Sequence, residues 1–359
     1  MTLGNRLLAL LLGILVAWPI SAQEQVPSDD FSSLSGQPIW RGASQFLLSQ
    51  VRVTLEGIHP ASLARRGRQP GLTLEEGWQS APRNRNLVIA VHGFYSNRDR
   101  TAALLAGPRE AGFPIGCFEY ASNKPIEDSA RLLSESLRKV ASQQPDRKIS
   151  LLTHSLGGVV ARAVVEDPEL DPGNVAQLIM IAPPNHGSGL ANLVQESREN
   201  LDADEPEGLV AVRLSQKLLY AAIGPAAKQL QLNSSFLSEL NGRPRNPAVE
   251  YAIFLGDKAP LPAGTDVFRY TSVEETDRAW RWTRWAGNGV KQRLANLSEI
   301  RKGEGDGVVS IASGRIEGVD DVVILHFHHN EPLWDPDEPV VQELYREVMK
   351  RLAPERTGE

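Results

Sequence analysis

The chain has 359 residues, of which 41% are hydrophobic and 23% are charged, and its net charge is −6. This length and balance are typical of one large α/β domain or two modest globular domains. The acidic balance argues against a general nucleic-acid-binding surface, because phosphate contacts rely on clustered Lys and Arg. No nucleic-acid partner is therefore expected.

Residues 1–22 have the layout of a secretory signal peptide. Arg6 precedes an apolar run over residues 7–18, Pro19 ends the run, and small residues lead to a cleavage site after Ala22. The run is shorter than the ~20 apolar residues that a membrane-spanning helix needs, so cleavage is favoured over an anchor. The expected localisation is exported, either periplasmic or secreted.

The next segments carry weaker signals. Residues 23–40 are polar and rich in Ser, which predicts a disordered linker. Residues 41–86 mix short apolar runs with Pro, Gly and Arg, and they predict a helix near residues 45–56 followed by a loop. The single cysteine, Cys117, lies in an apolar stretch typical of a strand. A small core thiol is therefore favoured there over a nucleophile, and no internal disulfide can form.

From residue 86 onward, apolar runs typical of buried strands alternate with amphipathic helical patterns. The strands are expected at residues 86–94, 113–120, 148–154, 175–184 and 249–257, and the helices at residues 102–112, 126–142 and 156–167. This alternation predicts an α/β fold with a parallel, doubly wound sheet. Right-handed crossovers then bring the carboxyl ends of the strands to one edge, where ligands bind.

Two insertions interrupt the alternation, near residues 190–245 and 258–303. Insertions of this size at the edge of a sheet usually cover a binding site, so both are expected to form cap-like structures. The second insertion contains Trp280, Trp282 and Trp285. A small core within the insertion is favoured for these side chains over contact with an apolar substrate or a membrane interface.

The stretch "LLTHSLGG" places Ser155 between a strand and a helix. This pattern indicates a nucleophile elbow, G-x-S-x-G, in which a tight turn lifts the Ser hydroxyl above the sheet. The N–H of Leu156, at the start of the helix, would then face the developing oxyanion. Gly157 provides the small residue on the helix side, whereas Thr153 stands where the motif has its first glycine. The alternative is a Ser that only caps the helix.

An acid and a base are expected after the Ser, in that order. Asp306 lies in the glycine-flanked turn "GEGDGVVS" and is the preferred acid, with Asp257 as the alternative. The strand-like run "VVILHFHHNEPLW" contains His326, His328 and His329, and His329, placed at the strand end, is preferred over His328 as the base. A metal site built on alternate histidines of one strand face is less favoured, because no matching ligand set accompanies it.

These motifs resemble those of secreted bacterial lipases and esterases of the α/β-hydrolase superfamily. The resemblance is strongest to the triacylglycerol-lipase and GPI-inositol-deacylase-like branch. The matching pieces occur in the family's order between residues 86 and 350: "VHGF", "THSLGGVVAR", "IAPPNHGSGLA", "LNSSFLSELN", "GDGVVS" and "HHNEPL". The resemblance implies one α/β-hydrolase domain over residues 41–359, with helical cap insertions in a mostly parallel sheet.

The same resemblance assigns site residues. Ser155, Asp306 and His329 match the family's catalytic triad, and the N–H groups of Phe94 and Leu156 match its oxyanion donors. Two further histidines receive other expectations: His92, which precedes the Ser in the chain, should order its loop, and His186 in "PPNHGSGLA" should be structural.

The implied activity is hydrolysis of lipid-like acyl esters through an acyl-enzyme, with no cofactor. "GDGVVS" also resembles a segment near bound calcium in some lipases, but no full set of oxygen ligands is evident, so structural calcium stays open. An acyltransferase or amidase with the same triad is an alternative, as is an inert binding protein with the hydrolase fold. The expected partner is an acyl-ester or lipid substrate, with transient contact to a lipid interface.

Overall fold

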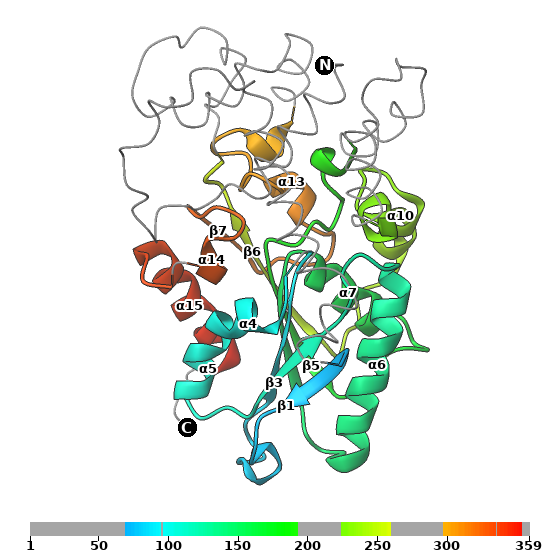
Figure 1. Cartoon of the computed structure of the whole chain (residues 1–359), viewed down its shortest axis with the longest axis vertical. Helices are drawn as coiled ribbons and strands as arrows, with labels where there is room; N and C mark the ends of the chain where they lie inside the picture. The colour runs from blue at the N-terminus through cyan, green and yellow to red at the C-terminus, as the bar shows by residue number, and fades with distance from the viewer. Residues whose placement is uncertain (1–68, 95, 193–223, 260–296, 335, 354–359) are drawn as a thin grey trace, which may run out of the picture.

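The computed structural model describes residues 69–94, 96–192, 224–259, 297–334 and 336–353. Within these residues, seven strands form one sheet in the order β1-β3-β2-β4-β5-β6-β7 (Figure 1). The pairs from β3 through β7 are all parallel, and β1 alone is antiparallel to its neighbour β3. The predicted mostly parallel, doubly wound sheet is therefore confirmed.

Five of the seven strands coincide with the apolar runs of the alternating region. The strands are β1 (Gly71–Leu74), β2 (Leu87–Val91), β3 (Ile115–Glu119), β4 (Ile149–His154), β5 (Val175–Ile181), β6 (Glu250–Gly256) and β7 (Val322–Leu325). Every residue of β2 and β4 is buried, because these central strands are covered by helices on both faces. This burial explains why β2, LVIAV, is apolar throughout rather than alternating, whereas the polar residues of β4, ISLLTH, are buried as well.

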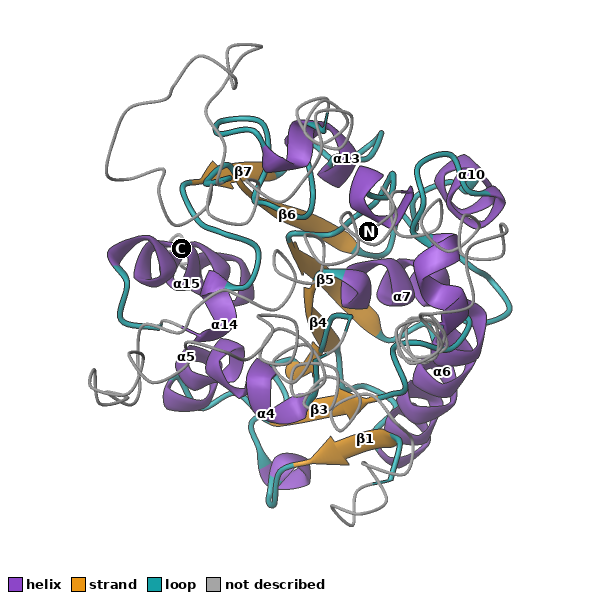
Figure 2. Cartoon of the chain, turned by 45° about the horizontal axis from the view of Figure 1, so that its top comes forward, coloured by secondary structure: helices purple, strands orange, loops and turns teal. Residues whose placement is uncertain are grey.

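Helices cover the two faces of the sheet. They are α4 (Arg98–Thr101), α5 (Ala106–Glu110), α6 (Ile126–Gln143), α7 (Leu156–Val165), α10 (Ser235–Gly242), α13 (Ile311–Gly314), α14 (Glu331–Trp334) and α15 (Pro339–Leu352), with short 3-10 turns η1 (Trp78–Ser80), η2 (Ala102–Leu105) and η5 (Ser298–Ile300). Figure 2 shows α6, α7 and α10 on one side of the sheet and α4, α5, α14 and α15 on the other.

Each face of the sheet has its own hydrophobic core. On β2, Leu87, Ile89 and Val91 pack in the core that includes α6 and α7, whereas Val88 and Ala90 pack in the core that includes α15. Successive side chains of a strand point to opposite faces, so one apolar strand contributes to both cores. The sheet is therefore packed between two helical layers. This packing fixes the positions of the strand ends at its carboxyl edge, where a site can form.

Three expectations about individual elements were wrong. The loop expected after residue 56 contains the edge strand β1, which is only four residues long and gains its pairing from the distant β3. The single helix expected over residues 102–112 is divided into η2 and α5. Pro108 lies in the first turn of α5, where its missing N–H needs no partner, and this position suits a new helix rather than a continued one. Strand β7 ends at Leu325, so His329 lies beyond the strand and not at its end.

Several expectations concern residues outside the described ranges. They include the signal peptide (1–22), the linker (23–40), the helix near 45–56, the three Trp residues and most of both insertions. These stay predictions. At the edge of the first insertion, residues 224–229 and α10 are helical. None of the helices in the described ranges combines the length and the apolar character needed to cross a membrane.

Candidate active site

Ser155 occupies a strained turn between β4 and α7. Its φ of 53° and ψ of −126° are outside the regions that non-glycine residues ordinarily adopt. Such strain persists only where the surrounding structure holds it, and it concentrates at functional sites. The Ser155 side chain makes no hydrogen bond that caps α7, so the simple capping interpretation is not supported.

The residues on either side of the turn explain how it fits. A Cβ on Gly157 would lie 2.5 Å from the carbonyl oxygen of Val91, so only glycine lets α7 start this close to the end of β2. On the strand side, Thr153 is fully buried and its hydroxyl donates to the Ile179 carbonyl of β5 at 3.1 Å. The threonine in place of the motif's first glycine is therefore accommodated by a satisfied hydroxyl.

His329 and Asp306 join Ser155 in one hydrogen-bonded chain. Nε2 of His329 lies 2.9 Å from Ser155 Oγ, and Nδ1 lies 2.8 Å from Asp306 Oδ2. All three side chains are buried. Because a carboxylate can only accept, Nδ1 carries the ring proton and Nε2 presents its lone pair to the Ser155 hydroxyl. The structure thus brings together the three residues that the sequence favours as nucleophile, base and acid.

The Asp306 turn is fixed by its own backbone. Oδ1 of Asp306 accepts the N–H groups of Val308 and Val309 at 2.9 and 2.8 Å, which leaves Oδ2 for the imidazole. Gly307 has a φ of 99°, a conformation that favours glycine and explains the "GDG" pattern. The carboxylate is therefore held in one orientation before any substrate binds.

The alternative residues have other contacts. Asp257 follows β6 and its Oδ1 lies 2.7 Å from Nδ1 of His326, whose side chain is more than half exposed. The amide of His328 donates to Glu331 Oε2 at 2.8 Å, and burial lowers the pKa of the His328 imidazole to about 4. The three histidines thus lie beyond β7 and have separate partners. They do not form the shared strand face on which the metal alternative was based.

The turn after β2 packs directly on Ser155. A Cβ on Gly93 would lie 2.9 Å from Ser155 Cβ, so this turn fits against Ser155 only with glycine. Phe94 follows Gly93, and Leu156 follows Ser155 as the first residue of α7. Both residues proposed as oxyanion donors are therefore in segments that border the Ser155 hydroxyl.

His92 holds the turn after β2 in place, as the sequence predicts. Its Nδ1 lies 2.9 Å from the Gly93 carbonyl and its Nε2 accepts the Tyr120 amide at 3.2 Å. The Tyr120 hydroxyl donates back to the His92 carbonyl at 2.8 Å, and the two rings stack 4.3 Å apart. Burial lowers the pKa of His92 to about 4, so near neutral pH the ring is uncharged and keeps its one proton on Nδ1.

His154 is a functional-site neighbour that the sequence reasoning missed. Its Nε2 lies 2.7 Å from the backbone carbonyl of His329, and the two rings are 5.0 Å apart. Burial, with a contribution from the nearby His329, lowers the pKa of His154 to about 3. The only sequence signal is its place in "THSLGG", because its partner is 175 residues away along the chain.

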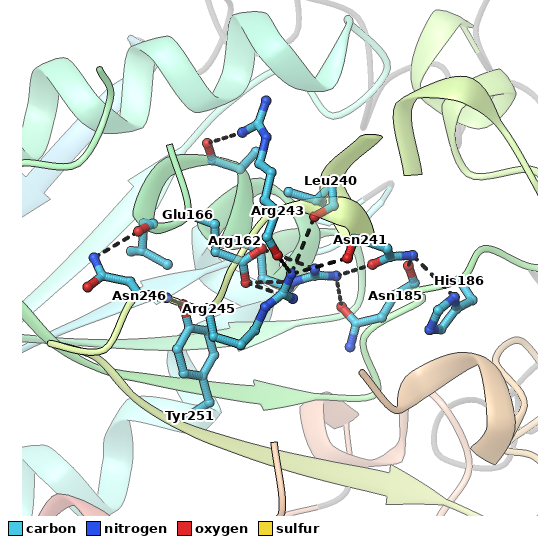
Figure 3. Close-up of polar contacts among 12 residues, drawn as sticks. Arg162, Glu166, Asn185, His186, Leu240, Asn241, Arg243, Arg245, Asn246 and Tyr251 are labelled. Atoms are coloured by element: carbon cyan, nitrogen blue, oxygen red, sulfur yellow. Dashed lines mark hydrogen bonds and ion pairs between the residues drawn. The ribbon is translucent and has the colours of Figure 1, made fainter. Parts of the chain in front are cut away.

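A buried polar network anchors the helix that follows Ser155 (Figure 3). Arg162 of α7 is fully buried and contacts both carboxylate oxygens of Glu166 at 3.0 and 3.1 Å. Its other terminal nitrogen donates to Asn185, in the loop after β5, and to Asn241 of α10, each at 3.0 Å. Asn185 in turn donates to the carbonyl of Gly314 in α13 at 2.6 Å. The network therefore connects α7 and α10 to the segment that follows the Asp306 turn.

His186 lies at the exposed end of this network. Its backbone amide donates to Ser313 at 2.9 Å, and its Nδ1 lies 3.2 Å from the Asn241 side-chain nitrogen. These contacts agree with the structural role expected for His186. The sequence reasoning missed Arg162, although a charged residue inside the apolar helix "LGGVVARAVV" is a signal that could have found it.

Within the described ranges, no group of three His, Cys, Asp or Glu side chains is placed to hold a metal ion. Cys117 of β3 is half-buried rather than fully in the core, and burial raises the pKa of its thiol to about 11. The expectations that no cofactor is needed and that calcium is open stay predictions.

Comparisons with known proteins agree with the fold. Residues 121–199 match the PGAP1-like alpha/beta domain. Over 145 residues the chain is 27% identical to triacylglycerol lipase 2 of Saccharomyces cerevisiae, an alignment that covers 38% of this chain and 40% of that protein. The chain thus matches less than half the length of this curated relative.

Among solved structures, the chain is similar to the mature form of the Bacillus licheniformis lipase BlEst2. The TM-score is 0.53 at 18% identity, and the match covers 79% of this chain and 99% of that one. The propeptide form of the same lipase gives the same TM-score and identity over 79% of this chain and 54% of that chain. The expected bacterial origin and secretion stay predictions. Together with the seven-stranded, mostly parallel sheet, these similarities show that the chain has the α/β-hydrolase fold.

Proposed function

We propose that the chain is a serine carboxylic ester hydrolase that acts on lipid-like acyl esters. The observation that carries the proposal is the hydrogen-bonded chain from Ser155 Oγ through His329 to Asp306, with distances of 2.9 and 2.8 Å. Nucleophile, base and orienting acid within hydrogen-bond reach, on a strained elbow, are the parts that acyl transfer needs. Ser155 is the proposed nucleophile, His329 the general base and Asp306 the acid that orients the imidazole.

The proposed reaction has two stages. Ser155 Oγ attacks the ester carbonyl carbon while its proton passes to Nε2 of His329. Asp306 stabilises the imidazolium and keeps its proton on Nδ1. The imidazolium then protonates the leaving alcohol as the carbon–oxygen bond breaks, which leaves the acyl group on Ser155. Water, activated by the same imidazole, releases the acid and restores the hydroxyl.

The oxyanion of each tetrahedral intermediate is proposed to rest on the N–H groups of Phe94 and Leu156. Two features support this assignment. The turn after β2 packs against Ser155 at Gly93, and α7 begins at Leu156, so the positive end of its backbone dipoles lies next to Ser155. One donor of this kind contributes roughly 3 kcal/mol to stabilisation of the transition state.

The lipid-like substrate class has separate support. The curated relative carries the name triacylglycerol lipase 2, and the similar solved structure is that of a lipase. In the sequence, the two insertions near residues 190–245 and 258–303 follow β5 and β6, and we propose that they form caps over an acyl site. We propose in addition that the chain acts after export, that it meets lipid interfaces transiently and that it needs no cofactor.

Turnover of p-nitrophenyl esters of increasing acyl length tests this proposal, with Ser155→Ala as the control. The expected result is turnover by the unaltered protein that depends on chain length and is lost in Ser155→Ala. Equal activity in both proteins would overturn the assignment of Ser155. Adding competing alcohols and amide substrates distinguishes a hydrolase from an acyltransferase or amidase, and a folded protein with no turnover of any of them would favour the inert binding protein.

A further inference from the structure

The neighbour of the nucleophile also contacts the base. Ser155 Oγ lies 2.9 Å from the His329 imidazole, and Nε2 of His154 lies 2.7 Å from the His329 backbone carbonyl. Two consecutive residues at the end of β4 therefore hold the side chain and the backbone of the same histidine. This is a direct link between the two halves of the site, which are more than 170 residues apart along the chain.

The contact between His154 and the His329 carbonyl defines which nitrogen of the His154 ring carries the proton. A backbone carbonyl only accepts hydrogen bonds, so the proton of the His154 ring is on Nε2. The ring is neutral near pH 7, because burial, repulsion from His329 and, to a smaller degree, repulsion from His92 lower the pKa of His154 to about 3. A neutral imidazole has a single N–H, and here that N–H serves the His329 carbonyl.

The other ring nitrogen shows that His154 is not chosen for packing alone. Nδ1 of His154 is buried and has no hydrogen-bond partner among the described residues. A buried polar atom without a partner costs about 1–3 kcal/mol, which an apolar side chain of similar size would avoid. The 2.7 Å hydrogen bond from Nε2 to the backbone carbonyl of His329 compensates for this cost.

We propose that His154 is a positioning residue for the base: its Nε2–H fixes the peptide of His329, so that the imidazole stays aligned between Ser155 and Asp306. The inference rests on the proposed function of Ser155 and His329. His329 follows β7 in a turn rather than in a strand, so its backbone has no ladder of sheet hydrogen bonds to hold it. Its amide is held by the Asp306 carbonyl at 3.0 Å, and its carbonyl by His154.

The test compares two substitutions that differ in one N–H. His154→Gln can place an amide N–H near the position of the ring Nε2, whereas His154→Met fills a similar volume without a donor. The readout is the rate at which a fluorophosphonate labels Ser155 in the full chain, together with kcat and KM for a p-nitrophenyl ester. We expect His154→Met to lose roughly 10- to 100-fold in labelling rate and kcat with little change in KM, because misplacement of a catalytic group costs about this much. His154→Gln should recover most of that loss.

Equal labelling rates in His154→Met and the unaltered protein would overturn the inference, as would an equal loss in both variants. Failure of the proposed function gives a different result. The unaltered protein would then not be labelled at all, or its labelling rate would equal that of Ser155→Ala. Nitrogen-15 NMR of histidine rings in the unaltered protein needs no variant. A neutral His154 ring protonated on Nε2 is the expected state, and a proton on Nδ1 would contradict the proposal even if both variants failed to fold.

Discussion

Asp306 contacts His329 twice. Its Oδ2 lies 2.8 Å from Nδ1 of the imidazole, and its backbone carbonyl accepts the His329 amide at 3.0 Å. The backbone contact fixes the main chain of His329, and this holds the imidazole next to the Asp306 carboxylate. Because of this double contact, we expect substitution of Asp306 to lower activity far more than substitution of Asp257.

Asp306→Asn should lower kcat for ester hydrolysis by roughly 10²- to 10⁴-fold, because the amide no longer stabilises the imidazolium or the required tautomer. Asp257→Asn is the matched control. Asp257, directly after β6, also contacts a histidine, but that histidine is the exposed His326. Steady-state kinetics with a p-nitrophenyl ester should show a large loss in the first variant and nearly full activity in the second. The reverse order would identify Asp257 as the acid.

Stability should depend on pH through the two fully buried histidines. The pKa of His92 is lowered to about 4 and that of His154 to about 3, chiefly by burial, whereas an unfolded chain binds these protons near pH 6.5. Their contribution to stability is therefore complete above pH 6.5 and is lost as pH falls toward 4. Each group should reduce the free energy of unfolding by about 1.4 kcal/mol per pH unit in that window.

Urea unfolding at several pH values between 7 and 4.5 measures this dependence. His92→Gln should give a shallower slope than the unaltered protein, because one group that binds a proton only in the unfolded chain is gone. An unchanged slope would show that His92 is protonated in the folded protein, in conflict with the lone pair that its Nε2 offers to the Tyr120 amide.

Two adjacent glycines of the elbow should respond differently to alanine. In Gly157→Ala the new Cβ would meet the backbone oxygens of Val91 and His92 at 2.5 and 2.7 Å, and backbone cannot move aside cheaply. The expected loss is about 1–3 kcal/mol of stability, with slower labelling of Ser155 because β2 is displaced. In Gly158→Ala the nearest atom is the Pro183 Cβ at 3.1 Å, a tight but small overlap.

For Gly158→Ala the gain in helix propensity, about 1 kcal/mol, offsets this overlap, so stability should change little. Thermal and urea unfolding of both variants test the contrast. Similar stability of the two proteins would mean that α7 does not approach β2 as closely as the structure indicates.

The buried network at Arg162 should contribute more to the free energy of unfolding than the ion pairs on the surface do. Glu166→Gln leaves the buried Arg162 guanidinium without its carboxylate and should cost about 3–5 kcal/mol of stability. Glu239→Gln is the control, because Glu239 is largely exposed where it contacts Arg243 and should cost at most a few tenths of a kcal/mol. Urea unfolding of the two variants decides the matter, and equal small losses would contradict the role of the network.

The sequence predicts those parts of the molecule whose signals are local. β2 is a continuous apolar run because both faces of the sheet are covered, and the five residues around Ser155 and Gly157 are enough to indicate the elbow. Asp306 could also be predicted from the sequence, because an Asp flanked by glycines indicates the tight turn in which its carboxylate is held.

The missed features depend on partners far along the chain. β1 is four residues long and is a strand only because it pairs with β3. His154 gains its meaning from a carbonyl 175 residues away, and Arg162 from Asn185 and Asn241. Local patterns do not identify such partners, although the charge inside the apolar helix α7 marks Arg162 as unusual. The end of β7 was misplaced for a related reason, because alternation continues into histidines that hydrogen bond outside the sheet.

The central claim is that Ser155 is an activated nucleophile. Its most direct test is incubation of the full chain with a fluorophosphonate, followed by intact mass measurement and mapping of the labelled peptide. One adduct per chain, on the peptide that contains Ser155 and absent from Ser155→Ala, is the expected result. A folded protein that stays unlabelled, or an adduct that persists in Ser155→Ala, would contradict the account.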